Sequence, residues 1–170
     1  MTLVNLDKVL SGRAGNIESV IVYADNTATV ALPDYTNGLF VGVAGLAEGH
    51  REAKIAFPAK GTEYDILLVA SPELSYDERL TKEDYKNAEG SVSRAYRLSF
   101  GDVIQLTEDL VPEQVEVGDV LVVGTGGKLT KVSSGSATNA FVVIEGLTNA
   151  ISLRQKSVAL EFVEFADAQE

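Results

Sequence analysis

Gly101-Asp102-Val103-Ile104 and Gly118-Asp119-Val120-Leu121 are two matched stretches of this chain. In each, a glycine and an aspartate, which both favour turns, precede a run of β-branched and aliphatic residues. This order is typical of a turn that opens a strand. We therefore predict that both stretches begin successive strands of a small all-β module.

Short apolar runs of strand length also occur in the sequence before and after these two stretches. Asn37-Gly38 favours a hairpin turn, because both residues tolerate positive φ. Ile66-Leu67-Leu68-Val69-Ala70 is continuously apolar, which predicts a strand covered on both faces. The predicted strands cover residues 19–23, 27–32, 39–43, 53–57, 66–70, 92–98, 103–106, 120–123, 128–132, 140–144 and 157–163. Many short strands with glycine-rich turns indicate a mainly β fold, a small barrel or a sandwich.

The chain divides by composition into an amino-terminal extended arm, a β-rich body and an acidic tail, at residues 1–18, 19–163 and 164–170. It is open whether the body holds two subdomains, 19–63 and 64–163. Residues 73–89 are crowded with charges and predict one insert, either a short helix or an exposed loop. For the tail, a solubilising end and a dock for a basic partner both remain open.

Composition narrows the classes of function. The formal net charge is −11, from 25 acidic and 14 basic residues, which would repel a phosphate backbone. No apolar stretch approaches the ~20 residues of a membrane span, and the start lacks the pattern of a signal peptide. We expect a chain that is made in the cytoplasm and binds neither nucleic acid nor a membrane. The absence of cysteine excludes disulfides and thiolate metal sites.

Catalytic signatures are weak. His50 is the single histidine, which excludes a multi-histidine metal site, and its turn-like surroundings favour a solvated loop residue. Gly124-Thr125-Gly126-Gly127-Lys128 lacks the spacing of a phosphate loop and predicts a hairpin turn. A further group of carboxylates lacks the spacing of a calcium loop and favours a solvated, salt-bridged face; it consists of Asp77, Glu78, Glu83 and Asp84. We expect no catalytic residue, cofactor or metal.

Two sets of sequence motifs carry a resemblance to known proteins. The first set consists of residues 66–73, Tyr76-Asp77-Glu78, Arg94-Ala95-Tyr96-Arg97-Leu98 and Gly101-Asp102-Val103. It resembles small structural proteins encoded near the major capsid gene of tailed bacteriophages. The second set consists of residues 118–123, Gly127-Lys128-Leu129-Thr130 and residues 141–146. It is similar to the β-tulip segment of lambda-type decoration proteins, in which a strand, a Gly-Lys hairpin turn and a strand returning to glycine follow one another. The resemblance covers residues 64–163 and extends to Leu6-Asp7-Lys8-Val9-Leu10. Residues 1–63 have no clear counterpart in lambda-type decoration proteins.

This resemblance implies a capsid decoration, or cement, protein of the virion with a β-tulip-like body. Such a protein would bind the outer surface of the head and clamp neighbouring major capsid subunits, often as a homotrimer. Many weak contacts gain strength from multivalent attachment and closed symmetry. Two alternatives stay open. One is a head-fibre base, connector or tail-tube component, and the other is a small carbohydrate-binding or hydrolytic module that uses surface carboxylates.

We expect the contacts with the capsid or with sister subunits in the arm and in the charged insert, because neither has the pattern of a core segment. The candidate contact residues are Leu3, Leu6, Val9, Leu10, Arg13, Asn16, Tyr76, Arg79 and Tyr85.

Overall fold

The computed structural model describes residues 4–8, 16–61, 65–73, 84–132, 139–148 and 155–164. These residues form eleven strands and one short 3-10 turn, so the fold is mainly β, as the sequence predicts. The strands are β1 (Val4–Lys8), β2 (Ile17–Val22), β3 (Phe40–Leu46), β4 (Ala53–Pro58), β5 (Ile66–Val69), β6 (Ser93–Tyr96), β7 (Val103–Thr107), β8 (Val120–Val123), β9 (Leu129–Lys131), β10 (Asn139–Thr148) and β11 (Ser157–Glu164). The 3-10 turn is η4 (Glu108–Leu110).

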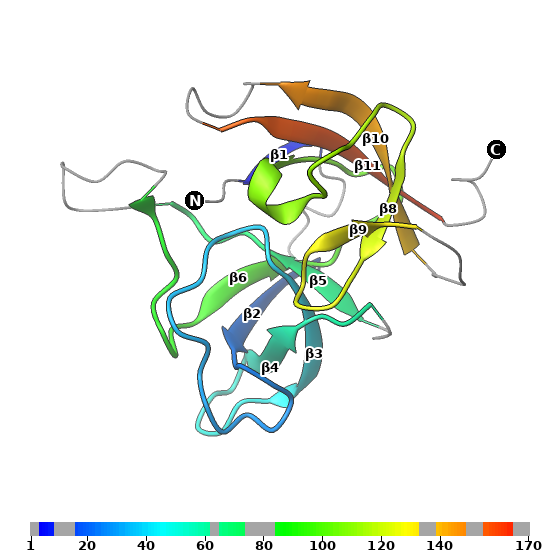
Figure 1. The fold of residues 1–170 in the computed structure, drawn as a ribbon. Coiled ribbons are helices and arrows are strands. Elements are labelled where there is room, and N and C mark those ends of the chain that lie inside the picture. The colour runs from blue at the N-terminus through cyan, green and yellow to red at the C-terminus, as the bar shows by residue number, and fades with distance from the viewer. Residues whose placement is uncertain are drawn as a thin grey trace.

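Five strands close into a barrel in the order β2-β4-β3-β5-β6 (Figure 1). β2 is parallel to β4 and antiparallel to β6, so the ring closes through strands that are far apart in sequence. Buried aliphatic side chains fill its interior, including Val20, Val41, Leu67 and Ala95. A small barrel of this kind is a packed core, and closure leaves its strands without open edges.

The other six strands form an antiparallel sheet in the order β1-β7-β11-β10-β8-β9. β1 lies at one edge and pairs with β7, with an irregular register between Asn5 and Lys8. Part of the predicted arm is therefore a strand of this sheet. The chain passes from the barrel to the sheet between Tyr96 and Val103; β5 and β6, which follow residue 63, belong to the barrel.

One hydrophobic core joins the barrel to the sheet. Phe40 of β3 and Leu68 of β5 point away from the barrel interior and pack in the same cluster as Ile104, Leu121 and Phe141 of the sheet. Because its residues alternate between this cluster and the barrel interior, β5 is covered on both faces, which confirms the prediction made for its apolar run. The barrel and the sheet thus share buried side chains.

The predicted strand at residues 27–32 is wrong. Asp25 accepts a hydrogen bond from the backbone N–H of Thr27, at 2.9 Å, and Ala28 has a positive φ of 55°. Both features belong to a turn, in which an aspartate side chain replaces a backbone acceptor. Only an isolated bridge between Ala31 and Tyr23 remains of the expected pairing.

The two matched stretches form the same turn and begin β7 and β8, as predicted. Their glycines have positive φ values of 86° and 92°. In the first, the Asp102 N–H donates to the Ser99 carbonyl at 3.0 Å, and the Asp102 carboxylate accepts the Ser99 N–H at 2.8 Å. In the second, Asp119 makes the same two bonds to Glu116, at 3.1 Å and 2.7 Å. The aspartate in each stretch therefore fixes the turn from both sides.

Replacing Asp119 with asparagine is expected to lower stability slightly at neutral pH and to have a smaller effect in acid. Hydrogen bonds from Lys131 and from the Glu116 N–H hold the pKa of Asp119 below its ordinary value. A carboxyl with a depressed folded-state pKa stabilises the fold above its unfolded pKa of about 4, and this contribution is lost as pH falls through the folded pKa. Urea unfolding of both proteins at about pH 7 and about pH 3 measures the difference, which for a surface ion pair is about 1 kcal/mol or less. A difference that does not depend on pH would contradict the assignment.

Candidate functional site

A groove of about 380 Å³ lies on the outer wall of the barrel, beside β2 and β6. Ile17 and Ser19 of β2 contribute one part of its lining, and Arg94 of β6 contributes another. Pro72 and Tyr85 come from the two ends of the charged segment that connects β5 to β6. The groove is therefore lined by residues of β2, of β6 and of the segment that connects β5 to β6.

The strand register places Ser19 beside Arg94. They are direct partners in the antiparallel β2–β6 pair, so their side chains lie on the same face of the sheet. Arg94 is exposed, whereas the adjacent pair, Val20 and Ser93, is buried, so Ser19 and Arg94 face outward. The Arg94 backbone is held by a bond from its N–H to the Ser71 hydroxyl, at 3.1 Å.

A buried hydrogen-bond network supports one side of the groove. The Asn87 side chain is 3 % exposed and its amide donates to the Asn37 side chain at 3.1 Å. Its carbonyl oxygen accepts bonds from the hydroxyls of Ser93, at 3.1 Å, and of Tyr85, at 3.3 Å. The Tyr35 hydroxyl lies 2.6 Å from that of Ser93, and burial raises the pKa of Tyr35, an effect that this bond partly offsets. The network fixes this end of the barrel and the backbone around Tyr85.

Two of the predicted contact residues can be placed in full. Tyr85 lines the groove and is half-buried. Asn16 immediately precedes Ile17 of the groove, and its carbonyl accepts the Arg97 N–H at 2.9 Å. Leu6 lies in β1, where the structure describes the backbone. The other predicted contact residues lie outside the described residues; they are Leu3, Val9, Leu10, Arg13, Tyr76 and Arg79.

Of the predicted contact residues, Tyr85 of the charged insert lines the groove, and Asn16 is next in sequence to the lining residue Ile17. Ser19 and Arg94 were not predicted, because each occupies a polar position of an alternating strand, a pattern that ordinary solvent-facing residues share. The cross-strand register identifies them, and it is not visible in the sequence.

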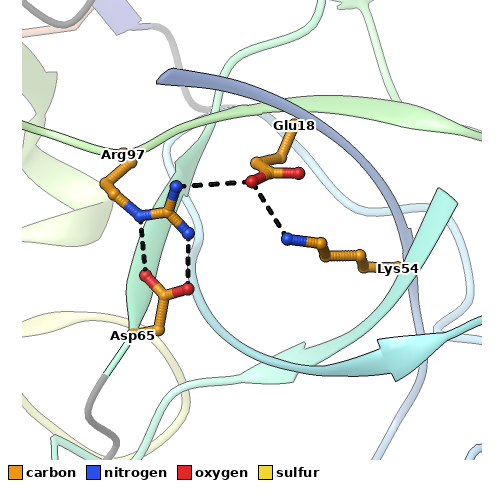
Figure 2. A network of polar contacts seen from close by, with 4 residues as sticks. All are labelled: Glu18, Lys54, Asp65 and Arg97. Carbon is orange, nitrogen blue, oxygen red and sulfur yellow. Dashed lines mark hydrogen bonds and ion pairs between the residues drawn. The ribbon is translucent and has the colours of Figure 1, made fainter. Parts of the chain in front are cut away.

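A second polar cluster closes one mouth of the barrel (Figure 2). The Arg97 guanidinium binds both oxygens of Asp65, at 3.0 Å and 2.5 Å, and reaches Glu18 at 3.3 Å. The Lys54 ammonium lies 3.0 Å from the same Glu18 oxygen. Each of these residues is two positions from a side chain of the barrel interior, so all four converge within the ring of strands.

This cluster has the properties of a structural plug. Its two cations and two carboxylates balance, and each charge has at least one partner of opposite sign. The hydrogen bonds from Arg97 to Asp65 and Glu18 outweigh desolvation and raise the pKa of Arg97. With its charges already satisfied, the plug offers little to an external ligand.

The remaining sequence candidates have ordinary surroundings. His50 is exposed in a turn and donates its backbone N–H to the Ala47 carbonyl at 3.1 Å, and residues 124–128 form the predicted hairpin between β8 and β9. Of the acidic cluster, Asp84 is described and the other three members lie outside the described residues. The described part of the chain contains no group of three or more histidine, aspartate or glutamate residues fit to hold a metal ion. Over the same residues, no helix has the length and apolar character needed to cross a bilayer.

Comparisons with protein-family models, with curated proteins and with solved structures find no match.

Proposed function

We propose that this chain is a structural protein of a phage particle, which binds the outer surface of the head and stabilises contacts between major capsid subunits. The observation that carries the proposal is the groove. Its lining includes Ile17, from the end of the predicted arm, and Tyr85, from the charged insert in which we expect capsid contacts.

The position of the sequence motifs that resemble lambda-type decoration proteins supports this proposal. These motifs lie on β8, on the β8–β9 hairpin and on β10, which are neighbours in one sheet. They are thus parts of one structural unit in this chain. We propose that this unit is similar to the β-tulip.

The β1 edge of the sheet offers a second means of attachment. β1 is an edge strand of five residues, and within the described chain its one strand neighbour is β7. A strand edge presents backbone donors and acceptors, which can pair with an extended segment of another subunit. Attachment through two weak surfaces, repeated in a homotrimer, would supply the multivalency that a cement protein needs.

Measurement of the copy number tests this function. Virions of the phage that encodes the chain are purified, and the chain is quantified against the major capsid protein by mass spectrometry. Decoration of the lattice predicts hundreds of copies per particle, because the contacts repeat with the capsid symmetry. A connector or head-fibre base would give about a dozen copies, by the same symmetry argument. Absence from purified virions would overturn the structural role altogether.

A further inference from the structure

We infer that the groove binds a carboxylate-bearing peptide segment, in which an acidic side chain contacts Arg94 and Ser19 while a neighbouring apolar side chain lies against Ile17 and Val92. This inference names the chemistry of the capsid segment that the groove would receive, and in that respect it rests on the proposed function.

Arg94 supplies the charge that selects the ligand. It is the charged residue of the groove lining, and among the described residues no carboxylate pairs with it. Arg97, three positions along the chain, differs sharply, since two carboxylates engage its guanidinium. A planar guanidinium binds a carboxylate through two parallel hydrogen bonds, and such charge-assisted pairs are the stronger ones in proteins.

Ser19 supplies a second donor at the same place. As the direct cross-strand partner of Arg94, it has its Cβ about 5 Å from that of the arginine. Its hydroxyl makes no hydrogen bond within the described residues. The hydroxyls of Ser71, Ser91 and Tyr85, by contrast, are engaged with backbone or side-chain partners. Ser19 and Arg94 therefore place two side-chain donors next to each other on the outer wall, and no bond within the described residues engages either of them.

The apolar part of the lining fits a peptide. Val92 is 51 % exposed although it lies beside the buried Ser93, and Ile17 and Pro72 extend the apolar surface. An exposed aliphatic side chain next to a charged donor suits an acidic residue followed or preceded by an apolar one. A doubly charged phosphate suits the site less well, because a chain of net charge −11 repels it more strongly than a single carboxylate.

Amide NMR titrations of the whole chain test the inference. The probe is acetyl-Leu-Glu-Leu-amide, and the matched neutral probe is acetyl-Leu-Gln-Leu-amide; inorganic phosphate and N-acetylglucosamine are titrated separately. We expect the glutamate probe to shift the signals of Ser19, Arg94 and Tyr85 with saturation in the millimolar range, and the glutamine probe to bind at least about tenfold more weakly, as for loss of one charge-assisted pair. Equal binding of the two peptides, or binding of phosphate or the sugar alone, would overturn it.

Variants then assign the contact. Arg94→Gln should weaken the glutamate probe by at least about tenfold, and Ser19→Ala by about threefold, in line with a charged and a neutral hydrogen bond. Arg51→Gln makes the same charge change at an exposed residue outside the groove and should leave the affinity unaltered. Arg94→Gln with unchanged affinity would refute the assignment.

Particle binding separates this inference from the proposed function. If the natural chain decorates virions and Arg94→Gln decorates them equally well, the groove chemistry is wrong and the structural role stands. If the natural chain is absent from virions, the structural role is wrong whatever the titrations give.

Discussion

Replacing Gly127 with alanine is expected to lower the free energy of unfolding by about 3 kcal/mol or more, through left-handed strain and overpacking together. Gly127 has a φ of 72°, and an added Cβ would lie 2.3 Å from the Phe40 carbonyl oxygen. The backbone has little room to move aside. Gly127 donates to the Ala59 carbonyl at 2.9 Å, and Phe40 donates to the Gly127 carbonyl at 3.0 Å. The tip of the β8–β9 hairpin is thereby bonded to the barrel.

The neighbouring Gly126 provides a matched control. Its φ of 82° is as unfavourable for alanine, but its added Cβ would meet no atom within 4 Å. Gly126→Ala should therefore cost about 1–2 kcal/mol, the strain alone. Urea unfolding measures both losses, and in a chain of this size each kcal/mol lowers Tm by about 2–4 °C. Equal losses for the two variants would show that the contact with Phe40 is not tight.

The strands could be predicted because their signals are local. Alternating or continuous apolar runs next to Gly and Asp turns located all the strands from β2 to β11, most of them to within one or two residues. The prediction of a strand at residues 27–32 is wrong for an equally local reason. Asp25 binds the Thr27 N–H and favours a turn over the β-propensity of the residues that follow. The sequence predicts an arm in place of β1, because no turn signal separates the short alternating run of this strand from the residues around it.

The pairing of the strands could not be predicted from local signals, and the groove depends on this pairing. The sequence suggests hairpins between neighbouring strands, yet β2 pairs with β4 and with β6. Such contacts are chosen by burial summed over the whole barrel, which no short segment of the chain encodes. Tyr85 could be selected as a residue without a core pattern, whereas Arg94 became recognisable only when the register placed it beside Ser19.

Replacing Phe141 with alanine is expected to destabilise the chain by about 3–5 kcal/mol, the range for removing a buried phenylalanine. Phe141 is 2 % exposed. Its ring meets that of Phe40 edge-on, with centroids 5.2 Å apart, and lies 5.0 Å from that of Phe162. The side chain thus occupies the place where the barrel and the sheet share their core, and its loss leaves a cavity between them.

Phe100→Ala is the control for this substitution. The Phe100 ring also stacks on Phe162, with centroids 5.3 Å apart, but it is 53 % exposed, so its removal opens no internal cavity. We expect it to cost about 1 kcal/mol. Because Phe40, Leu68 and Phe141 belong to one cluster, Phe141→Ala should weaken the barrel and the sheet together, in a single transition in urea followed by both near- and far-ultraviolet circular dichroism. Two separated transitions, or a loss no greater than that of Phe100→Ala, would mean that the barrel and the sheet are stable independently of their shared core.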